Sequence, residues 1–452
     1  MKLSVAETLA ADVLALKAKI LPAKVRSTCE NLLIDVAGLC VAARNTEYAL
    51  AVKKSLDAGG RCTALGHTKT FNAENAALLN GTAAHGEDFD DTFEGGPVHS
   101  GAVVVPAVLA ACEHFGRSGR DALLGIAAGV EALCRLSLVA PKKIHQAGFH
   151  PTAVLGVMGS TLGVSVALKL NKTQTVNALG IAGSMAGGII EYLAEGAWTK
   201  RLHAGWAAQS GLRAARLAKE GFVGPRTVFE GTHGLFFAFA HDVNSQYEKL
   251  TQSFGKDWQM TGLTFKPYAT GTMNQPYIDC ALRLAKKGFS SEDVAEVMCE
   301  TAEGYVHRLW EPLAAKQRPA NDYAAKFSTP FNIAVAFVTG GAGFEAFTAR
   351  TVREKRVLAL AAKVRYVVDP DNPYPRAYTG HVRMTLKDGR VFEERQPHIR
   401  GGMHEPLARA ELEQKFRGNA AWGGWSRPHA ERFLAFARKA FDGKMDLSPF
   451  RR

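Results

Sequence analysis

The stretch His381–Arg395, with the sequence HVRMTLKDGRVFEER, carries the clearest structural signal in the chain. Val382, Met384 and Leu386 alternate with polar residues, as in a strand that buries one of its faces. The segment 387–390 (KDGR) supplies a turn, and an Asp-Gly pair between two alternating runs is typical of a β-hairpin. We therefore predict an antiparallel hairpin over these residues.

Two further strands are expected before this hairpin, at Val294–Thr301 and Val364–Val368. The chain ahead of residue 265 instead predicts one helix after another, because apolar residues recur there at helical spacing. The expected helical segments are Leu32–Cys40, Ala76–Ala84, Val103–His114, Ala122–Leu138, Ala207–Leu217 and, in the tail, Ala408–Phe416 and Ala430–Phe441. Ser27–Glu30 fits a capping box that would begin the first of them. The fold class is therefore mainly α, with a helical domain followed by a smaller α+β domain.

Composition limits the function classes. The 452 residues exceed one ordinary core, and 47% hydrophobic against 22% charged residues is a globular composition. The 55 basic and 43 acidic residues give a net charge of +12, which suits an anionic substrate. The cations are scattered rather than gathered in blocks, which argues against a nucleic-acid partner.

The seven cysteines indicate reduced thiols, because their number is odd, their spacing is wide and no CxxC occurs. This pattern favours neither a disulfide framework nor an iron–sulfur cluster. No signal peptide is visible, and the uncharged apolar stretch Gly101–Cys112 is too short to span a bilayer. We expect a cytoplasmic protein without a membrane partner.

An acidic stretch is the first candidate for chemistry. Ala84–Thr92 (AHGEDFDDT) places four carboxylates within five residues, with His85 before them and His99 after them. Such crowded like charges raise one another's pKa unless cations or N–H donors offset them. Three interpretations stay open: a solvated loop, a metal site, or acid/base residues for an organic acid.

Basic clusters favour the organic acid. Gly148–Thr152 (GFHPT) places His150 in a turn just before a helix, and Trp198–Gly205 (WTKRLHAG) places cations beside an apolar helix. Lys266 adds a cation where the fold changes character. A histidine base with cations near it suits removal of a proton next to a carboxylate, because the cations stabilise the developing enolate-like charge.

Taken together, these motifs resemble the MmgE/PrpD family, which includes 2-methylcitrate dehydratase, cis-aconitate decarboxylase and iminodisuccinate epimerase. The resemblance spans roughly residues 5–445. The matching segments are Asn80–His85, Asp88–Thr92, Gly148–Thr152, Thr199–Gln209, Gly221–Gly231, Lys266–Tyr268 and Ala325–Ser328. The resemblance implies a discontinuous all-helical domain (1–265 and 401–452), an α+β lid domain (266–400), a site between them, a homodimer, and no cofactor or metal.

Site residues follow from the resemblance position by position. Asp88 and Thr92 match the family's acidic loop, His150 its Phe-His-Pro histidine, Lys200 its Thr-Lys lysine, and Lys266 the lysine that opens the lid.

Three departures from the family pattern bear on the reaction. His99 follows Val98 without the usual His-Pro-Ser order. Gly271, with Gln275 nearby, stands where some members have a histidine, and Phe331 stands about where decarboxylase-type members have a tyrosine. The last two departures disfavour cis-aconitate decarboxylation.

The resulting hypothesis is a cofactor-independent lyase, most like 2-methylcitrate dehydratase, that acts on a small di- or tricarboxylic acid. The expected catalytic residues are Asp88, His99, His150 and Lys200, and the expected substrate-binding residues are Thr92, Arg201, His203, Lys266 and Gln275. His150 or His99 would be the base, and Asp88 would orient a histidine or act as an acid.

Several alternatives remain at this stage. They are a dicarboxylate epimerase, a cis-aconitate decarboxylase, a non-enzymatic basic binding protein, and a metal-dependent hydrolase. The hydrolase would use His85, Glu87, Asp88, Asp91 and His99.

Overall fold

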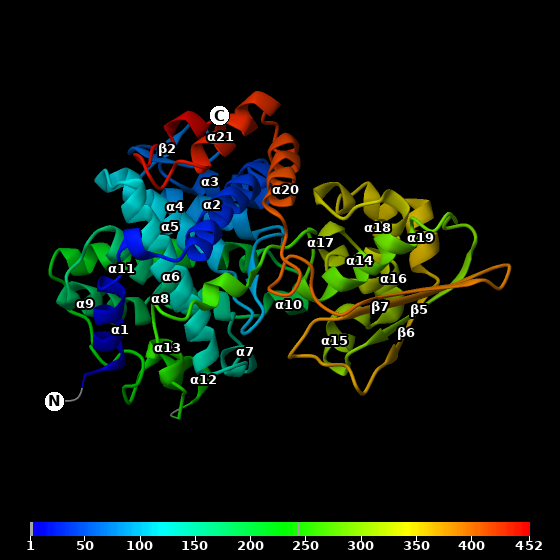
Figure 1. The fold of residues 1–452 in the computed structure, drawn as a ribbon, viewed down its shortest axis with the longest axis horizontal. Coiled ribbons are helices and arrows are strands. Elements are labelled where there is room, and N and C mark those ends of the chain that lie inside the picture. The colour runs from blue at the N-terminus through cyan, green and yellow to red at the C-terminus, as the bar shows by residue number, and fades with distance from the viewer. Residues whose placement is uncertain (1–2, 243) are drawn as a thin grey trace. The chain divides into compact units, whose positions relative to one another are not determined.

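Helices dominate the computed structural model, which describes residues 3–242 and 244–452 (Figure 1). By backbone contacts the chain divides into two units. Unit 1 contains the chain up to Gly86, Asp90–Leu263 and Arg409–Arg452, and unit 2 contains Glu87–Phe89 and Thr264–Ala408. We retain the domain division at residues 265 and 400 as a proposal.

Unit 1 is built almost entirely from helices, as the apolar periodicity predicts. Its helices include α1 (Val5–Leu14), α2 (Ala23–Ala43), α3 (Glu47–Ser55), α4 (Ala73–His85), α5 (Ser100–Phe115), α6 (Gly119–Val139), α7 (Lys143–Gln146), α8 (Pro151–Ala167), α9 (Lys172–Gly183), α10 (Tyr192–Glu195), α11 (Thr199–Lys219), α12 (Leu235–Ala240), α13 (Glu248–Thr251), α20 (Arg409–Trp422) and α21 (Arg427–Ala437). Three two-residue strands accompany them: β1 (Cys62–Thr63), β2 (Thr70–Phe71) and β3 (Thr92–Phe93).

The C-terminal tail returns to the start of the chain. Figure 1 shows α20, in orange, beside the blue α2. Phe416 of α20 lies where a side chain on Gly38 of α2 would have to go, at 2.9 Å from an added Cβ. The Lys415 Nζ lies 2.7 Å from the buried Asp35 carboxylate. The predicted helical tail is therefore an integral part of unit 1.

The predicted capping box at Ser27–Glu30 is wrong. Helix α2 begins one turn earlier, at Ala23, directly after Pro22. Proline is well tolerated there, because the missing N–H has no intrahelical partner at the start of a helix. Ser27 therefore lies inside the helix.

Helix α6 is long and apolar enough to cross a membrane by length and composition. In the structure 89% of its most apolar window is buried. A core helix passes the same test, and burial of this degree is the property of a core helix. The predicted thiols fit the same interior, because all seven cysteines are buried and free.

Unit 2 contains the mixed sheet. Its strands β5 (Val294–Thr301), β6 (Val364–Val368), β7 (Gly380–Leu386) and β8 (Val391–Gln396) lie in the order β6-β5-β7-β8. β5 is parallel to β6 and antiparallel to β7, and β7 and β8 form the hairpin. All the predicted strands are therefore confirmed. β4 (Leu263–Thr264) lies at the boundary of the two units.

Helices accompany the sheet in unit 2. They include α14 (Gln275–Leu284), α15 (Glu303–Tyr305), α16 (Leu313–Gln317), α17 (Asp322–Ala325), α18 (Thr329–Thr339) and α19 (Lys355–Ala361). α14 is tied to the hairpin by Arg283, whose Nε donates to the Glu394 carboxylate on β8 at 2.8 Å. The hairpin thus buries its apolar face, as its alternation requires.

Candidate active site

Two predicted histidines stand at helix N-termini in unit 1. His99 is the residue before α5, and His150 is the residue before α8, which begins with Pro151. The backbone N–H of His99 donates to the Thr152 hydroxyl at 3.2 Å, so the two helix starts lie side by side. The positive end of a helix dipole favours anions, so this arrangement suits a carboxylate substrate.

The predicted cations belong to α11 itself rather than to a segment beside it. The expected helix began at Ala207, but α11 begins at Thr199, so Lys200, Arg201 and His203 occupy its first turns. All three are buried, with about 8% of each exposed. These polar residues interrupt the apolar periodicity, so the predicted start of α11 lies too late in the sequence.

Two glycines let α11 approach α4 closely. A Cβ on Gly205 would lie 2.2 Å from the Leu78 carbonyl oxygen, and one on Gly81 would lie 2.7 Å from the Gly205 Cα. No side chain fits between the helices at this crossing. It therefore fixes where the C-terminal end of α4 and the N-terminal end of α11 stand in unit 1.

Replacing Gly205 with alanine is expected to destabilise the protein by about 1–3 kcal/mol, because the backbone must move to admit the methyl group. Gly418 is the matched control, since it is also inside a helix of unit 1 but has nothing within 4 Å of an added Cβ. Gly418→Ala should be neutral or stabilise by about 0.5–1 kcal/mol. Urea unfolding of both variants measures the difference, and equal effects would contradict this account of the crossing.

Imidazole rings gather at these helix ends. The Nδ1 atoms of His150 and His203 lie 3.1 Å apart, so one ring donates a hydrogen bond to the other. The ring of His85, the last residue of α4, lies 5.7 Å from that of His150 and 4.9 Å from that of His99, between centroids. The Tyr192 ring closes the cluster, 6.1 Å from the His150 ring.

Burial keeps two of these imidazoles neutral. It lowers the pKa of His150 well below the ordinary 6.5, and the charges of His85 and Lys200 lower it further. The same causes lower the pKa of His203 to about 4. A neutral imidazole is able to accept a proton at neutral pH, so both groups can serve as bases.

Lowering the pH from 6.5 to 4 is expected to destabilise the folded state through His203. The unfolded chain protonates this residue near 6.5 and the folded chain only near 4. Between these values the unfolded state therefore holds more protons, and the free energy of unfolding falls with the pH. His203→Gln should remove a dependence on the order of 3 kcal/mol at most. Urea unfolding at both pH values tests this; an unchanged difference in the variant would contradict it.

The acidic stretch contributes one carboxylate to the rings. Asp90 Oδ2 lies 2.7 Å from His85 Nδ1, and Asp90 Oδ1 lies 3.6 Å from His99 Nδ1. The predicted orienting carboxylate is Asp88, two residues earlier, so the carboxylate that contacts the histidines is a different one. Asp90 is fully buried, which makes a positive partner valuable to it.

Asp91 anchors the start of α5 instead. Its carboxylate accepts the backbone N–H groups of Ser100 and Gly101, at 3.1 and 2.9 Å, and the Ser100 hydroxyl. Burial and the neighbouring Asp90 raise the pKa of Asp91 to about 7, against the lowering effect of these donors. Thr92, the predicted substrate ligand, follows in β3 and is buried.

Arg201 stacks on an aromatic ring. Its guanidinium lies 4.4 Å from the centroid of the Tyr48 ring, on α3. Stacking on a ring holds the planar group in one orientation and leaves its edge for hydrogen bonds.

The remaining predicted residues, Asp88, Lys266 and Gln275, belong to unit 2. Lys266 Nζ donates to the Asp88 carbonyl at 3.0 Å, and both residues are buried. Asp88 has a φ of 54°, a left-handed conformation that aspartate tolerates better than most residues. The lysine therefore helps to hold the backbone that carries Asp88.

Gln275 is engaged with its own loop. Its Oε1 accepts the Tyr268 N–H at 3.2 Å, and its Nε2 donates to the Tyr268 and Thr270 carbonyls at 3.0 and 3.1 Å. These bonds give it a structural role, and the structure offers no support for its predicted contact with substrate.

Comparison with known proteins identifies the family of the chain. The MmgE/PrpD N-terminal domain matches residues 7–248, and the MmgE/PrpD C-terminal domain matches residues 268–438. The chain belongs to the MmgE/PrpD family. Its relatives include the cis-aconitate decarboxylase of Homo sapiens, 31% identical over 76% of this chain and 72% of that protein. They also include the cis-aconitate decarboxylase-like protein oryM of Aspergillus oryzae, 26% identical over 90% of this chain and 88% of that protein.

A third MmgE/PrpD relative is the cis-aconitate decarboxylase of Aspergillus terreus, 25% identical over 88% of this chain and 85% of that protein. Two of these relatives bear the name of a decarboxylase, which is a lyase, and the family likeness supports an enzyme. Two residues that the sequence analysis singled out as departures lie in unit 2. Phe331 is fully buried against Phe347, and a Cβ on Gly271 would have only ordinary contacts.

In this MmgE/PrpD chain the residues that could hold a metal ion differ from the predicted set. Of the predicted set, Glu87 and Asp88 belong to unit 2, while His85, Asp91 and His99 belong to unit 1. Within residues 3–242 and 244–452, the group that could hold an ion is His85, Asp90 and His99, with ligand atoms within 4.8 Å of one another. However, the His99 Nδ1 lies 2.7 Å from the Asp91 carbonyl, which can only accept, so this nitrogen carries a hydrogen. A metal would have to displace that bond, so the donors fit an ion poorly.

Sequence reasoning missed His85 and Asp90 as parts of the acid/base site. Both residues belong to the acidic stretch Ala84–Thr92. His85 was predicted only as a ligand of the metal-dependent hydrolase, and Asp90 was predicted neither as a catalytic residue nor as a ligand. Among the four crowded carboxylates nothing in the sequence marks Asp90, because its contacts with His85 and His99 appear only in the folded chain.

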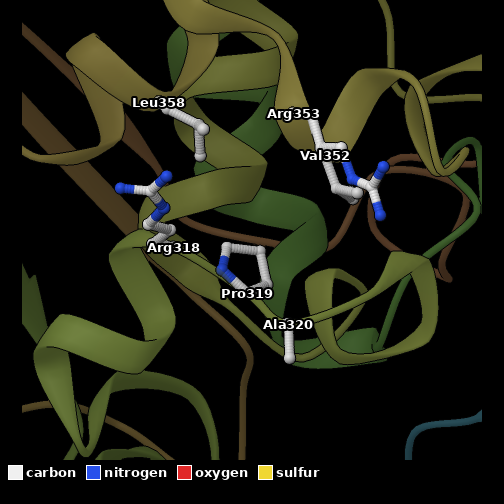
Figure 2. A pocket seen from close by; sticks show the side chains of 6 residues that line it. All are labelled: Arg318, Pro319, Ala320, Val352, Arg353 and Leu358. Atoms are coloured by element: carbon white, nitrogen blue, oxygen red, sulfur yellow. The ribbon is translucent and has the colours of Figure 1, made fainter.

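A separate cavity of about 440 Å³ lies in unit 2, lined by Arg318, Pro319, Ala320, Val352, Arg353 and Leu358. Figure 2 shows Pro319 between the two arginines. The cavity offers positive charge but no acid/base group, and none of the predicted site residues lines it. We assign it no part in the chemistry.

Proposed function

We propose that this MmgE/PrpD protein is a lyase that dehydrates a small hydroxy di- or tricarboxylic acid without a cofactor. The observation that carries the proposal is the pair of buried imidazoles, His150 and His203, whose Nδ1 atoms lie 3.1 Å apart where α8 and α11 begin, with the charge of Lys200 acting on both. A base, a cation and positive helix ends together are what proton removal next to a carboxylate requires.

In this proposal His150 Nε2 takes the proton from the carbon next to a substrate carboxylate. The electrons of the C–H bond form the alkene, and the C–O bond breaks so that hydroxide leaves with a proton as water. Lys200 and Arg201 hold the substrate carboxylates, since a guanidinium can bind one in bidentate fashion. The expected roles of Asp88, Thr92 and Lys266 remain predictions from the family likeness.

Decarboxylation is the second candidate, because the relatives bear the name cis-aconitate decarboxylase. There the carbon–carbon bond to a carboxylate breaks, CO₂ leaves, and a protonated imidazole supplies the proton to the resulting carbanion. The same cations would serve it. Against it stand Gly271, where some members of the family have a histidine, and Phe331, which stands about where decarboxylase-type members have a tyrosine.

One assay separates these reactions. The purified protein is incubated in heavy water with citrate-like, malate-like, aconitate-like and amino-dicarboxylate acids, and proton NMR and CO₂ release are followed. A new alkene from a hydroxy acid without CO₂ supports dehydration. Release of CO₂ from an aconitate-like acid supports decarboxylation, and deuterium at the α-carbon without either supports an epimerase. No reaction with any acid in a folded preparation would refute the proposal.

The remaining expectations accompany this proposal. We propose a cytoplasmic homodimer without nucleic-acid or membrane partners. Sedimentation of the purified chain would test the dimer.

A further inference from the structure

His85 is a buried histidine, and one of its ring nitrogens lacks a hydrogen-bond partner among the described residues. Its side chain is fully buried, and its Nε2 has no hydrogen-bond partner among the described residues. A buried polar atom without a partner is costly, so such an atom inside a reactive cluster points to a ligand that supplies one. The neighbouring rings are those of His99 and His150, both predicted to act on substrate.

Asp90 fixes the state of this ring. Its carboxylate only accepts, so the 2.7 Å contact places a hydrogen on His85 Nδ1. A fully buried carboxylate at this distance also stabilises the imidazolium form of the ring, as the aspartate of a catalytic triad does. In that form Nε2 carries a proton that has no partner among the described residues.

The two ends of the cluster favour opposite charge states. His85 is the last residue of α4, where the negative end of the helix dipole favours a cation. His150 precedes α8, where the positive end disfavours one, and its Nδ1 faces another imidazole rather than a carboxylate. When environments separate two titratable groups in this way, one is suited to be the acid and the other the base.

We propose that His85, whose Nδ1 is hydrogen-bonded to Asp90 and whose Nε2 has no partner among the described residues, is the general acid that protonates the leaving hydroxyl group. This inference rests on the proposed dehydration. His150 Nε2 takes the carbon proton, the C–H electrons form the double bond, and the C–O bond breaks. The departing oxygen takes the proton from His85 Nε2 and leaves as water. The cycle ends when the proton on His150 returns, through solvent, to His85.

The proposal also defines the substrate class. A proton donor in the site serves a substrate acid that bears a hydroxyl group on the carbon next to the one that loses its proton. An acid whose leaving group needs no proton has no use for His85. This difference supplies the test.

The test compares Asp90→Asn, His85→Gln, their double variant and His150→Asn on two substrates: the hydroxy acid found in the assay above, and its analogue with fluorine in place of the hydroxyl. Fluoride leaves without a proton. We expect Asp90→Asn and His85→Gln to lose about 10²–10⁴-fold in kcat on the hydroxy acid and to keep most activity on the fluoro acid. The double variant should lose no more than the worse single variant, because Asp90 acts through His85. His150→Asn should lose both activities.

Glu113→Gln is the matched control, since Glu113 is also a largely buried carboxylate of unit 1 but accepts hydrogen bonds from the backbone N–H and the hydroxyl of Thr63, both at 2.7 Å. It should leave both activities unchanged. Activity on the fluoro acid also shows that a variant is folded.

Equal losses on both substrates would overturn the proposal, because His85 would then be supporting the base or the fold. Unchanged turnover of the hydroxy acid in Asp90→Asn would overturn it as well. If the wild-type protein dehydrates no acid, the proposed function is wrong, and the role proposed for His85 is wrong as well. If the wild-type protein dehydrates the acid and both Asp90→Asn and His85→Gln keep this activity, only the role proposed for His85 is wrong.

Discussion

Replacing His150 with asparagine is expected to reduce kcat by about 10²–10⁴-fold, the usual contribution of a positioned general base. The asparagine amide can take the place of Nδ1 and keep the 3.1 Å contact with His203. It has no atom at the position of Nε2, where the proposed base acts. The substitution therefore removes the chemistry with little change in the packing of the cluster.

The Michaelis constant should change much less than kcat, because Lys200 and Arg201 are left to hold the substrate carboxylates. His233→Asn is the control, since His233 is an exposed histidine of unit 1. Steady-state kinetics with the acid identified by the NMR assay measure both constants. A His150→Asn protein that keeps full turnover would remove His150 from the mechanism.

The pH profile gives the same residue a second test. kcat/KM reports the ionisation of the free enzyme, and burial lowers the pKa of His150 well below 6.5. The base therefore stays neutral as the pH falls through 6.5, so the acidic limb of kcat/KM should lie below that value. A limb at 6.5 or above would assign the base to a more ordinary histidine.

The fold was largely predictable where its signals are local. The alternation of Val382, Met384 and Leu386 around an Asp-Gly turn specifies a hairpin without reference to the rest of the chain, and β7 and β8 are found there. The start of α11 was misplaced because Lys200 and His203 occupy buried positions where periodicity expects apolar side chains. Departures of this kind are typical of functional sites, which break local rules that the rest of a fold obeys.

The partners within the site were not predictable. His150 and His203 are 53 residues apart in sequence, and their contact depends on how α8 and α11 pack. Asp90 contacts His85 across five residues, but only because the chain leaves unit 1 at Glu87 and returns at Asp90. The residue types in the sequence can indicate candidate histidines and carboxylates, whereas the contacts between them are known only from the folded structure.

Replacing Lys326 with methionine is expected to destabilise unit 2 by about 3–5 kcal/mol, the usual result of removing one partner of a buried ion pair. Lys326 is 1% exposed. Its Nζ lies 3.1 Å from the Glu87 carboxylate and donates to the Glu87 and Ala269 carbonyls at 3.0 and 2.9 Å. Methionine keeps an unbranched side chain but supplies no donor and no charge, so the largely buried Glu87 carboxylate loses this cation.

Lys287→Met is the matched control, because Lys287 also pairs with a glutamate of unit 2, Glu394 at 3.1 Å, but is about half exposed. Exposed pairs contribute about 0–1 kcal/mol, so this variant should unfold almost as the wild type does. The double variant Lys326→Met with Glu87→Gln should recover part of the loss, since no charge is then left unpaired by the first change. Urea unfolding at neutral pH measures all three. If Lys326→Met and Lys287→Met behave alike, the lysine does not hold the Glu87–Phe89 segment, and the placement of Asp88 in unit 2 must depend on Lys266.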